Sequence, residues 1–338
     1  MDNKCVLPFI NHDYQFNKPC CELTRFDSSS DMEQLLDDHR NNRKSKFCES
    51  CWKIEESGIK SKRQAYNESY GMQESLTERS VNMAVIPVGN VCNLYCVTCN
   101  PMLSTSWFKK HQSMHPNNYK GKAITDIKVS DIKDIDQLKH IEFIGGETLK
   151  SPSLWQYLTT LDREKSFSLQ TNGTVELTDK QIELLKSFKK FNICFSIDGH
   201  GKIFEYMRQP AKWNFLTENI KKYIKNFGID RLSTYITIGN LNIFYVDEIV
   251  LNIFKLVPSK LDINLVNNPT EFAYDNLDEQ TGELVEKNNP VFFKKYRVKW
   301  IGNPQSLART LDNLKKQDAF SGLKFEDHLP EVFSLLLK

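Results

Sequence analysis

Three cysteines lie close together in the sequence, at positions 92, 96 and 99. Spacings of four and three residues would place them on one face of a helix, but Gly89 precedes the run and Pro101 follows it, so a loop is the better prediction. Three thiolates can hold three irons of a four-iron cluster, and the fourth iron is then open to a small molecule. Cys92, Cys96 and Cys99 therefore predict an open iron–sulfur cluster.

A zinc site is the main alternative for these thiols. Cys48 and Cys51 form a second Cys-x-x-Cys pair, which together with Cys96 and Cys99 would supply four thiolates. The two pairs are separated by far more than the roughly 15 to 20 residues usual in such sites, and zinc leaves Cys92 without a role. The spacing favours the open cluster, and a zinc-binding interaction protein without catalytic activity is the rival hypothesis.

The segments around these cysteines alternate between strand and helix patterns. Short apolar runs rich in β-branched and aromatic residues predict strands at 83–88, 140–144, 167–170, 191–197, 235–238 and 261–266. Helical periodicity predicts helices at 153–161, 179–190, 215–227 and 247–256. This alternation indicates an α/β fold with a parallel sheet, either doubly wound or curled into a full or partial barrel. Six strands are too few for a closed eight-stranded barrel. Cys194, alone in an apolar run, is expected to be a core residue.

Polar or glycine-containing sequences follow four successive predicted strands. The cysteine run follows the first strand, and Gly-Gly-Glu at 145–147 follows the second. Thr-Asn-Gly at 171–173 and Ser-Ile-Asp-Gly at 196–199 follow the third and fourth. Each sequence alone is common in turns. Because ligands of parallel α/β folds bind at the carboxyl ends of the strands, the shared position predicts a binding site on one face.

The cysteine spacing resembles the signature of the radical S-adenosylmethionine (SAM) superfamily. The resemblance implies a partial (β/α)6 barrel of the TIM type, in which Cys92, Cys96 and Cys99 hold a catalytic 4Fe-4S cluster whose open iron binds SAM. In such enzymes the reduced cluster cleaves SAM, and a 5′-deoxyadenosyl radical then removes a hydrogen atom from the substrate. An external electron donor such as flavodoxin or ferredoxin is also implied. No residue is assigned to acid–base chemistry on the substrate.

The second strand-end motif resembles the part of that superfamily's site that receives the ammonium group of SAM. Gly145 and Gly146 would let backbone carbonyls approach the ligand, and Glu147 would pair with the amine. Thr98 departs from the family pattern. The residue before the last cysteine is usually an aromatic that packs on adenine, and the resemblance places Thr98 at that contact.

Residues after the third and fourth strands resemble further cofactor contacts. Ser196, Asp198 and Arg208 match residues that bind the methionine carboxylate and the ribose, and arginine suits a carboxylate through a two-point contact. Asn172 is assigned to the same cofactor site, although Thr-Asn-Gly alone would also suit a turn.

The first eighty residues carry a second set of thiols. Cys5, Cys20, Cys48 and Cys51 resemble the ligands of SPASM or twitch auxiliary-cluster domains, here placed before the barrel as in one branch of radical SAM proteins that includes many from bacteriophages. Cys20 is preferred to its neighbour Cys21 on this resemblance. A second 4Fe-4S cluster is expected, and four thiolates would also suit zinc.

These motifs divide the chain into three expected parts: an auxiliary-cluster domain at 1–80, the barrel at 81–270 and a helical extension at 271–338. Relatives with auxiliary clusters often modify peptides, so a peptide or protein side chain is the first expected substrate. A nucleotide, DNA or a cell-envelope precursor is the alternative.

Composition restricts the partners and the compartment. The formal net charge is +2, so no polyanion such as nucleic acid is indicated. No apolar run approaches the roughly 20 residues that cross a bilayer, and the first residues lack the apolar core of a secretory signal. A cytoplasmic protein is expected, in which nine cysteines indicate metal ligands rather than disulfides.

Overall fold

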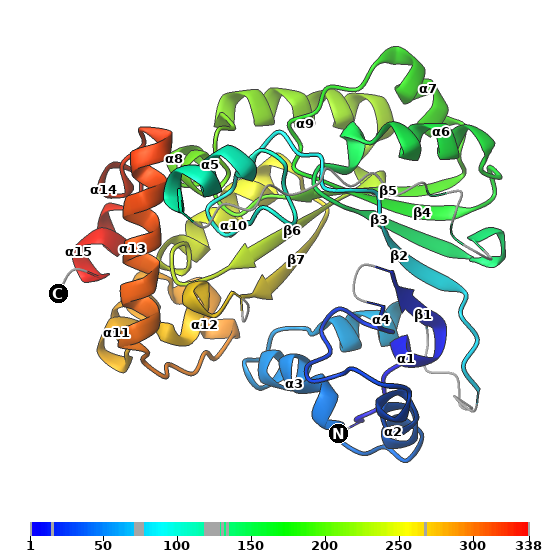
Figure 1. Cartoon of the computed structure of the whole chain (residues 1–338), viewed down its shortest axis with the longest axis horizontal. Coiled ribbons are helices and arrows are strands. Elements are labelled where there is room, and N and C mark those ends of the chain that lie inside the picture. The colour runs from blue at the N-terminus through cyan, green and yellow to red at the C-terminus, as the bar shows by residue number, and fades with distance from the viewer. Residues whose placement is uncertain are drawn as a thin grey trace.

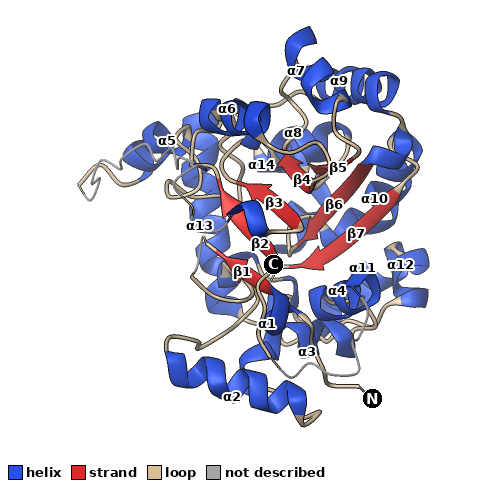
Figure 2. Ribbon diagram, turned by 90° about the vertical axis from the view of Figure 1, so that its right-hand side faces the viewer, coloured by secondary structure: helices blue, strands red, loops and turns tan. Residues whose placement is uncertain are grey.

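One parallel sheet of seven strands organises the residues that the computed structural model describes, which are 2–14, 17–70, 78–117, 129, 132, 135–266 and 269–336. The strands lie side by side in chain order (Figure 1): β1 (Asn11–Asp13), β2 (Met83–Pro87), β3 (His140–Ile144), β4 (Ser166–Thr171), β5 (Lys190–Ser196), β6 (Leu232–Ile238) and β7 (Lys260–Leu265). A doubly wound sheet would reverse its strand order at a switch point. The sequential order instead gives a curled partial barrel (Figure 2).

Helices follow most of the strands, and further helices lie in the amino-terminal and carboxyl-terminal parts of the chain. Those between strands β2 and β7 are α5 (Trp107–Met114), α6 (Pro152–Thr160), α7 (Asp179–Lys186), α8 (Gly201–Met207), α9 (Trp213–Phe227) and α10 (Val246–Leu256). The amino-terminal helices are α1 (Leu7–Ile10), α2 (Ser29–Arg40), α3 (Glu49–Glu56) and α4 (Lys62–Tyr70). The carboxyl-terminal helices are α11 (Glu279–Asn288), α12 (Pro290–Lys295), α13 (Pro304–Ser321), α14 (Phe325–His328) and α15 (Pro330–Leu336). None of these described helices has the length and apolarity needed to cross a membrane.

All six predicted strands are confirmed, and so are the four predicted helices. Strand β1 was not predicted, because its three residues, Asn-His-Asp, lack an apolar pattern. It comes from the first eighty residues and pairs with β2 at the edge of the sheet. The division of the chain into three domains stays a prediction.

The two faces of the sheet differ in chemistry because side chains alternate along each strand. One face is aromatic and packs on the covering helices: Phe143 contacts Tyr157, and Phe195 contacts Tyr223, in edge-on ring pairs. The other face is polar, with Glu142 on β3, Gln170 on β4, Cys194 on β5 and Tyr235 on β6 among its residues. The expectation that Cys194 is a core residue was wrong, since it belongs to this polar face and is partly exposed.

The amino-terminal segment lies on the polar side of the sheet, opposite α6, α7 and α9 (Figure 1). Tyr66 of α4 hydrogen-bonds through its hydroxyl to the Glu142 carboxylate of β3. The long helix α13 packs against α5 at the other end of the molecule. The amino-terminal segment therefore contacts the sheet itself, and the carboxyl-terminal helix contacts α5, the helix that follows the cysteine loop.

The aromatic face predicts a large and local cost for truncating Phe167. Its side chain is fully buried and contacts the rings of Phe188 and Phe191. Phe167→Ala should lower the free energy of unfolding by about 3–5 kcal/mol, through lost burial and the cavity left behind. Phe254, which is 51% exposed, is the matched control: Phe254→Ala should change it by only about 0.5 kcal/mol. Equal losses in urea denaturation would contradict this packing.

Candidate functional site

The loop that carries Cys92, Cys96 and Cys99 joins β2 to α5 and crosses the carboxyl end of β3. Two backbone hydrogen bonds fix the crossing: the Gly146 N–H donates to the Gly89 carbonyl at 2.9 Å, and the Glu147 N–H donates to the Val91 carbonyl at 2.8 Å. These bonds place the first cysteine directly beside the end of β3.

Two glycines make this crossing sterically allowed. A Cβ added to Gly145 would lie 2.7 Å from the Gly89 carbonyl oxygen, and one added to Gly146 would lie 2.7 Å from the backbone of Asn90 and Val91. Both distances are far below a normal contact, and backbone atoms cannot swing aside. From the sequence, these glycines were expected to let backbone carbonyls approach a ligand. In the structure, they make room for the backbone of the cysteine loop.

The middle of the loop is attached to the segment after α8. The Tyr95 N–H donates to the Gln209 carbonyl at 2.7 Å, and the Val97 N–H donates to the Met207 carbonyl at 2.9 Å. Gln317 of α13 donates its amide to the Val97 carbonyl at 3.2 Å. The carboxyl-terminal helix therefore buttresses the loop, a role that the sequence did not indicate.

The three loop thiols lie within electrostatic reach of one another. Burial raises the pKa of Cys92 and of Cys99 to about 12, and in both cases the neighbouring Cys96 raises it further. Burial also raises the pKa of Cys96. Thiolates are the form that binds metal, so these thiols require a strongly cationic group to ionise at neutral pH.

The three loop thiols can be compared with the donor sets of known metal sites. Within the described ranges, no group of three or more His, Cys, Asp or Glu side chains is gathered as the ligands of one metal ion would be. The three thiols of an open cluster each bind a different iron. Three coupled thiols on one loop fit the donor set of such a cluster.

Glu147 is buried at the end of β3, and its carboxylate ties neighbouring strand ends together. It accepts hydrogen bonds from the Thr171 hydroxyl at 2.7 Å, the Asn172 N–H at 2.8 Å and the Leu149 N–H at 3.1 Å. Burial raises the pKa of Glu147. An ionised carboxylate has roughly four acceptor positions, so one remains for another donor.

Asn172, at the end of β4, lies beside the first loop cysteine. Its amide nitrogen is 4.0 Å from the Cys92 sulfur and donates to the Asn93 side chain at 3.0 Å. Its side-chain oxygen accepts from the Thr174 N–H at 2.9 Å. The structure thus brings Asn172 to the cysteine loop, as the shared strand-end position predicted.

Asp198 and Arg208 form a buried ion pair near Cys96. The Arg208 Nε and Nη2 atoms lie 2.9 and 2.7 Å from the same Asp198 oxygen, and the other oxygen accepts from the Thr237 N–H at 3.0 Å. Arg208 also opposes the rise in the pKa of Cys96, which places its charge close to that thiol. Ser196 is the last residue of β5, two positions before Asp198. Its hydroxyl accepts from the Gln170 side-chain amide at 3.2 Å.

Thr98 shares a narrow cavity with Asp198 and with residues at the end of β6. Its lining includes Thr237, Gly239 and Asn240. The Asn240 side-chain oxygen is buried and has no hydrogen-bond partner among the described residues. The sequence did not lead to a prediction that the end of β6 belongs to the site. Gly239 and Asn240 follow β6 directly, just as the other motifs follow their strands.

The amino-terminal thiols form a second group. Cys5, Cys20, Cys48 and Cys51 are all buried, and burial raises the pKa of Cys5 to about 12 and of Cys51 to about 11. Burial also raises the pKa of Cys48, with Cys5 and then Cys51 adding to the effect. Cys5, Cys20 and Cys48 pack into one small core, and the neighbouring Cys51 acts electrostatically on all three.

Cys20 and Cys21 interact with each other but differ in exposure. The hydrogen bond to Cys21 and burial raise the pKa of Cys20, with Cys51 adding a smaller effect. Cys20 is buried, whereas Cys21 is partly exposed and accepts from the Lys62 ammonium at 3.3 Å. The preference for Cys20 stays a prediction.

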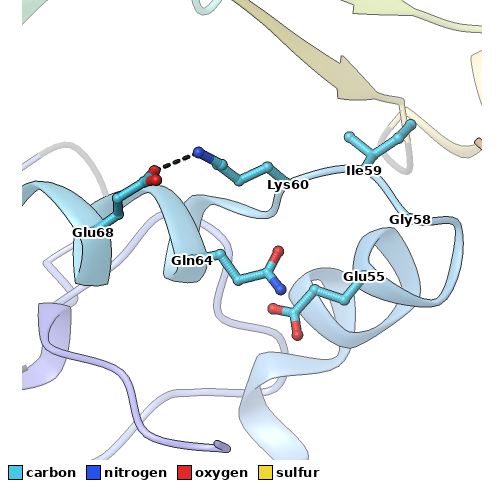
Figure 3. A pocket seen from close by; sticks show the side chains of 6 residues that line it. All are labelled: Glu55, Gly58, Ile59, Lys60, Gln64 and Glu68. Atoms are coloured by element: carbon cyan, nitrogen blue, oxygen red, sulfur yellow. Dashed lines mark hydrogen bonds and ion pairs between the residues drawn. The ribbon is translucent and has the colours of Figure 1, made fainter. Parts of the chain in front are cut away.

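A surface hollow of about 420 Å³ lies elsewhere, between α3 and α4 (Figure 3). It is lined by Glu55, Gly58, Ile59, Lys60, Gln64 and Glu68. Both carboxylates are already paired, Glu55 with Arg63 and Glu68 with Lys60. The hollow contains no thiol and is separate from the cysteine loop.

Comparison with known proteins gives weak likenesses. No family model and no curated protein matches the chain. The solved structure of native anSMEcpe with bound AdoMet is 15% identical, with a TM-score of 0.40, over 64% of this chain and 62% of that one. Streptococcus suis SuiB bound to S-adenosylmethionine is 10% identical, with a TM-score of 0.39, over 83% and 57%. Escherichia coli HemN, a coproporphyrinogen III oxidase described as a radical SAM enzyme, is 12% identical, with a TM-score of 0.35, over 72% and 53%. The chain spans about six-tenths or less of each.

The glycine crossing predicts that a single methyl group will loosen the cysteine loop. Gly146→Ala should expose the three loop thiols and speed their modification by a thiol reagent about tenfold, measured for each cysteine by mass spectrometry. Gly201→Ala is the control, because nothing lies within 4 Å of its added Cβ and its cost is limited to the strain of a φ of +50°. Unchanged labelling in Gly146→Ala would contradict the crossing.

Proposed function

We propose that the chain is a radical SAM enzyme, in which Cys92, Cys96 and Cys99 hold a 4Fe-4S cluster with one open iron. The observation that carries the proposal is the coupled thiol triad on a loop fixed at the carboxyl ends of parallel strands. Bound there, the reduced cluster would supply the electron that cleaves SAM reductively and so starts hydrogen abstraction from a substrate.

The strand-end residues would bind and orient SAM beside the loop. Glu147 keeps one acceptor position beyond its three hydrogen bonds, which suits an ammonium group. Arg208 places a buried guanidinium near Cys96, where it would attract the methionine carboxylate. Asp198 holds that guanidinium in place, and Ser196 and Asn172 supply polar groups on either side.

The adenine end of SAM would extend toward Thr98 and the end of β6. The unsatisfied oxygen of Asn240 suits an exocyclic amine, and the backbone of Gly239 is close by. Adenine would then be held by polar contacts. The usual aromatic contact is lost, because Thr98 stands at the position where the family has an aromatic residue.

The amino-terminal thiols would hold a second 4Fe-4S cluster through Cys5, Cys20, Cys48 and Cys51. Their burial and mutual effect on pKa support one shared metal group. Zinc would suit the same four thiolates. The substrate, proposed as a peptide or protein side chain, would lie along the polar face of the sheet between this segment and SAM.

Iron content and SAM cleavage test the proposal together. The full chain, purified anaerobically, should be brown with about eight irons, or about four if the amino-terminal thiols hold zinc. With dithionite and SAM it should release 5′-deoxyadenosine, and the triple variant Cys92→Ala, Cys96→Ala, Cys99→Ala should release none. Cys194→Ala is the matched control and should retain release, since Cys194 lies on β5 outside both thiol groups. A colourless reconstituted protein, or release by the triple variant, would sink the proposal.

Glu147 offers a test of cofactor binding apart from cluster binding. Glu147→Gln keeps the shape but removes the charge, so SAM affinity should fall about 10- to 100-fold, as expected for a lost charge-assisted hydrogen bond. Iron content should stay at the level of the unsubstituted protein. If iron falls in parallel with SAM affinity, measured by equilibrium dialysis, Glu147 acts only in holding the strand ends together.

A further inference from the structure

Lys110 of α5 is a fully buried lysine directly beneath the cysteine loop. Its side chain is 0% exposed, and its ammonium donates to the Tyr95 carbonyl at 3.1 Å and to the Gln209 side-chain oxygen at 3.3 Å. The same ammonium lies 5.0 Å from the Tyr95 ring centre and 4.5 Å from that of Trp107. Neutral groups therefore surround this charge at short range.

No carboxylate oxygen of the described residues lies within 4.0 Å of the Lys110 ammonium in an ion pair. Asp318 is within electrostatic range, but its two oxygens accept from the Tyr206 hydroxyl and the Phe325 N–H, each at 2.8 Å. A buried ammonium without an opposite charge is strongly unfavourable, and burial lowers the pKa of Lys110 to about 7. A nearby anionic group is needed to keep it charged.

The loop thiols lie next to the groups that Lys110 and its helix contact. Its ammonium donates to the carbonyl of Tyr95, the residue directly before Cys96. Trp107, on the same helix, donates its indole N–H to the Cys96 carbonyl at 2.9 Å. Thiolates formed on metal binding would place their negative charge close to this ammonium. A loaded loop would therefore add a negative charge to surroundings in which Lys110 contacts only neutral oxygens at short range.

We propose that Lys110 is a built-in counter-charge to the iron–sulfur cluster of this loop, a positioning residue that makes the cluster easier to reduce. The inference rests on the proposed function and goes beyond it. Reduction adds one electron to the cluster, and a fixed positive charge nearby stabilises that added charge in a medium of low polarity. The two buried cations near the loop differ in their pairing: Arg208 is paired with the Asp198 carboxylate, whereas Lys110 makes no ion pair among the described residues.

The reduction potential of the cluster tests this role. It is measured in the full chain by redox titration, following the electron paramagnetic resonance signal that changes when SAM is added. Lys110→Met should lower the equilibrium constant for reduction at least about tenfold, a shift of about 59 mV toward more negative values. Lys110→Arg should stay within about threefold of the unsubstituted protein. Lys109→Met, which removes an exposed lysine from the same helix, should do the same.

A second variant keeps the lysine in place in case Lys110→Met does not fold. Gln209→Glu puts a negative charge on the group that Lys110 contacts, and it loses no hydrogen bond, because the Gln209 amide nitrogen has no partner among the described residues. It should lower the potential in the same direction. Unshifted potentials in both Lys110→Met and Gln209→Glu would overturn the inference while leaving the cluster assignment intact. A missing SAM-sensitive signal in the unsubstituted protein would instead overturn the proposed function and, with it, the role of Lys110.

Discussion

The close contact between the cysteine loop and the end of β3 is the constraint on which the candidate site depends. Gly145 and Gly146 let the backbone of residues 89–91 cross at a distance that no side chain would permit. Two backbone hydrogen bonds then fix the loop, and further bonds from residues 207–209 and from Gln317 hold its middle. Backbone contacts therefore place the thiols. A metal group would bind to a loop whose position is already fixed.

The buried charged groups around this loop differ in whether they are paired. A metal group bound to thiolates would supply the negative charge that one of them lacks. Arg208 is paired with Asp198, and Glu147 accepts three hydrogen bonds from neutral donors, which leaves one acceptor position open. Lys110 has no such partner among the described residues, and the thiols themselves have raised pKa values. A buried cation is costly alone, and so is a buried thiolate, so binding of a metal group that ionises the thiols would let the two opposite charges stabilise each other.

Sequence periodicity predicted the six strands from β2 to β7, because a parallel sheet buried on one face leaves long apolar patterns. It also predicted that residues such as Asn172 would meet the cysteines, since strand ends of a parallel sheet share one edge. It missed strand β1, whose three residues are polar and which forms only by pairing with β2. Lys110 and Gln317 could not be found either, because their role depends on helices that meet the loop in three dimensions. The glycine pair was identified, but its structural role in admitting the loop appears only in the folded chain.

In the proposed function, three thiols hold a four-iron cluster with one open iron that binds SAM. Mössbauer spectroscopy tests it most directly, on the full chain with Cys48 and Cys51 replaced by alanine and loaded with the Mössbauer isotope of iron. One iron of the cluster should change its isomer shift when SAM is added, while the other three should not. Four equivalent irons that ignore SAM would contradict it.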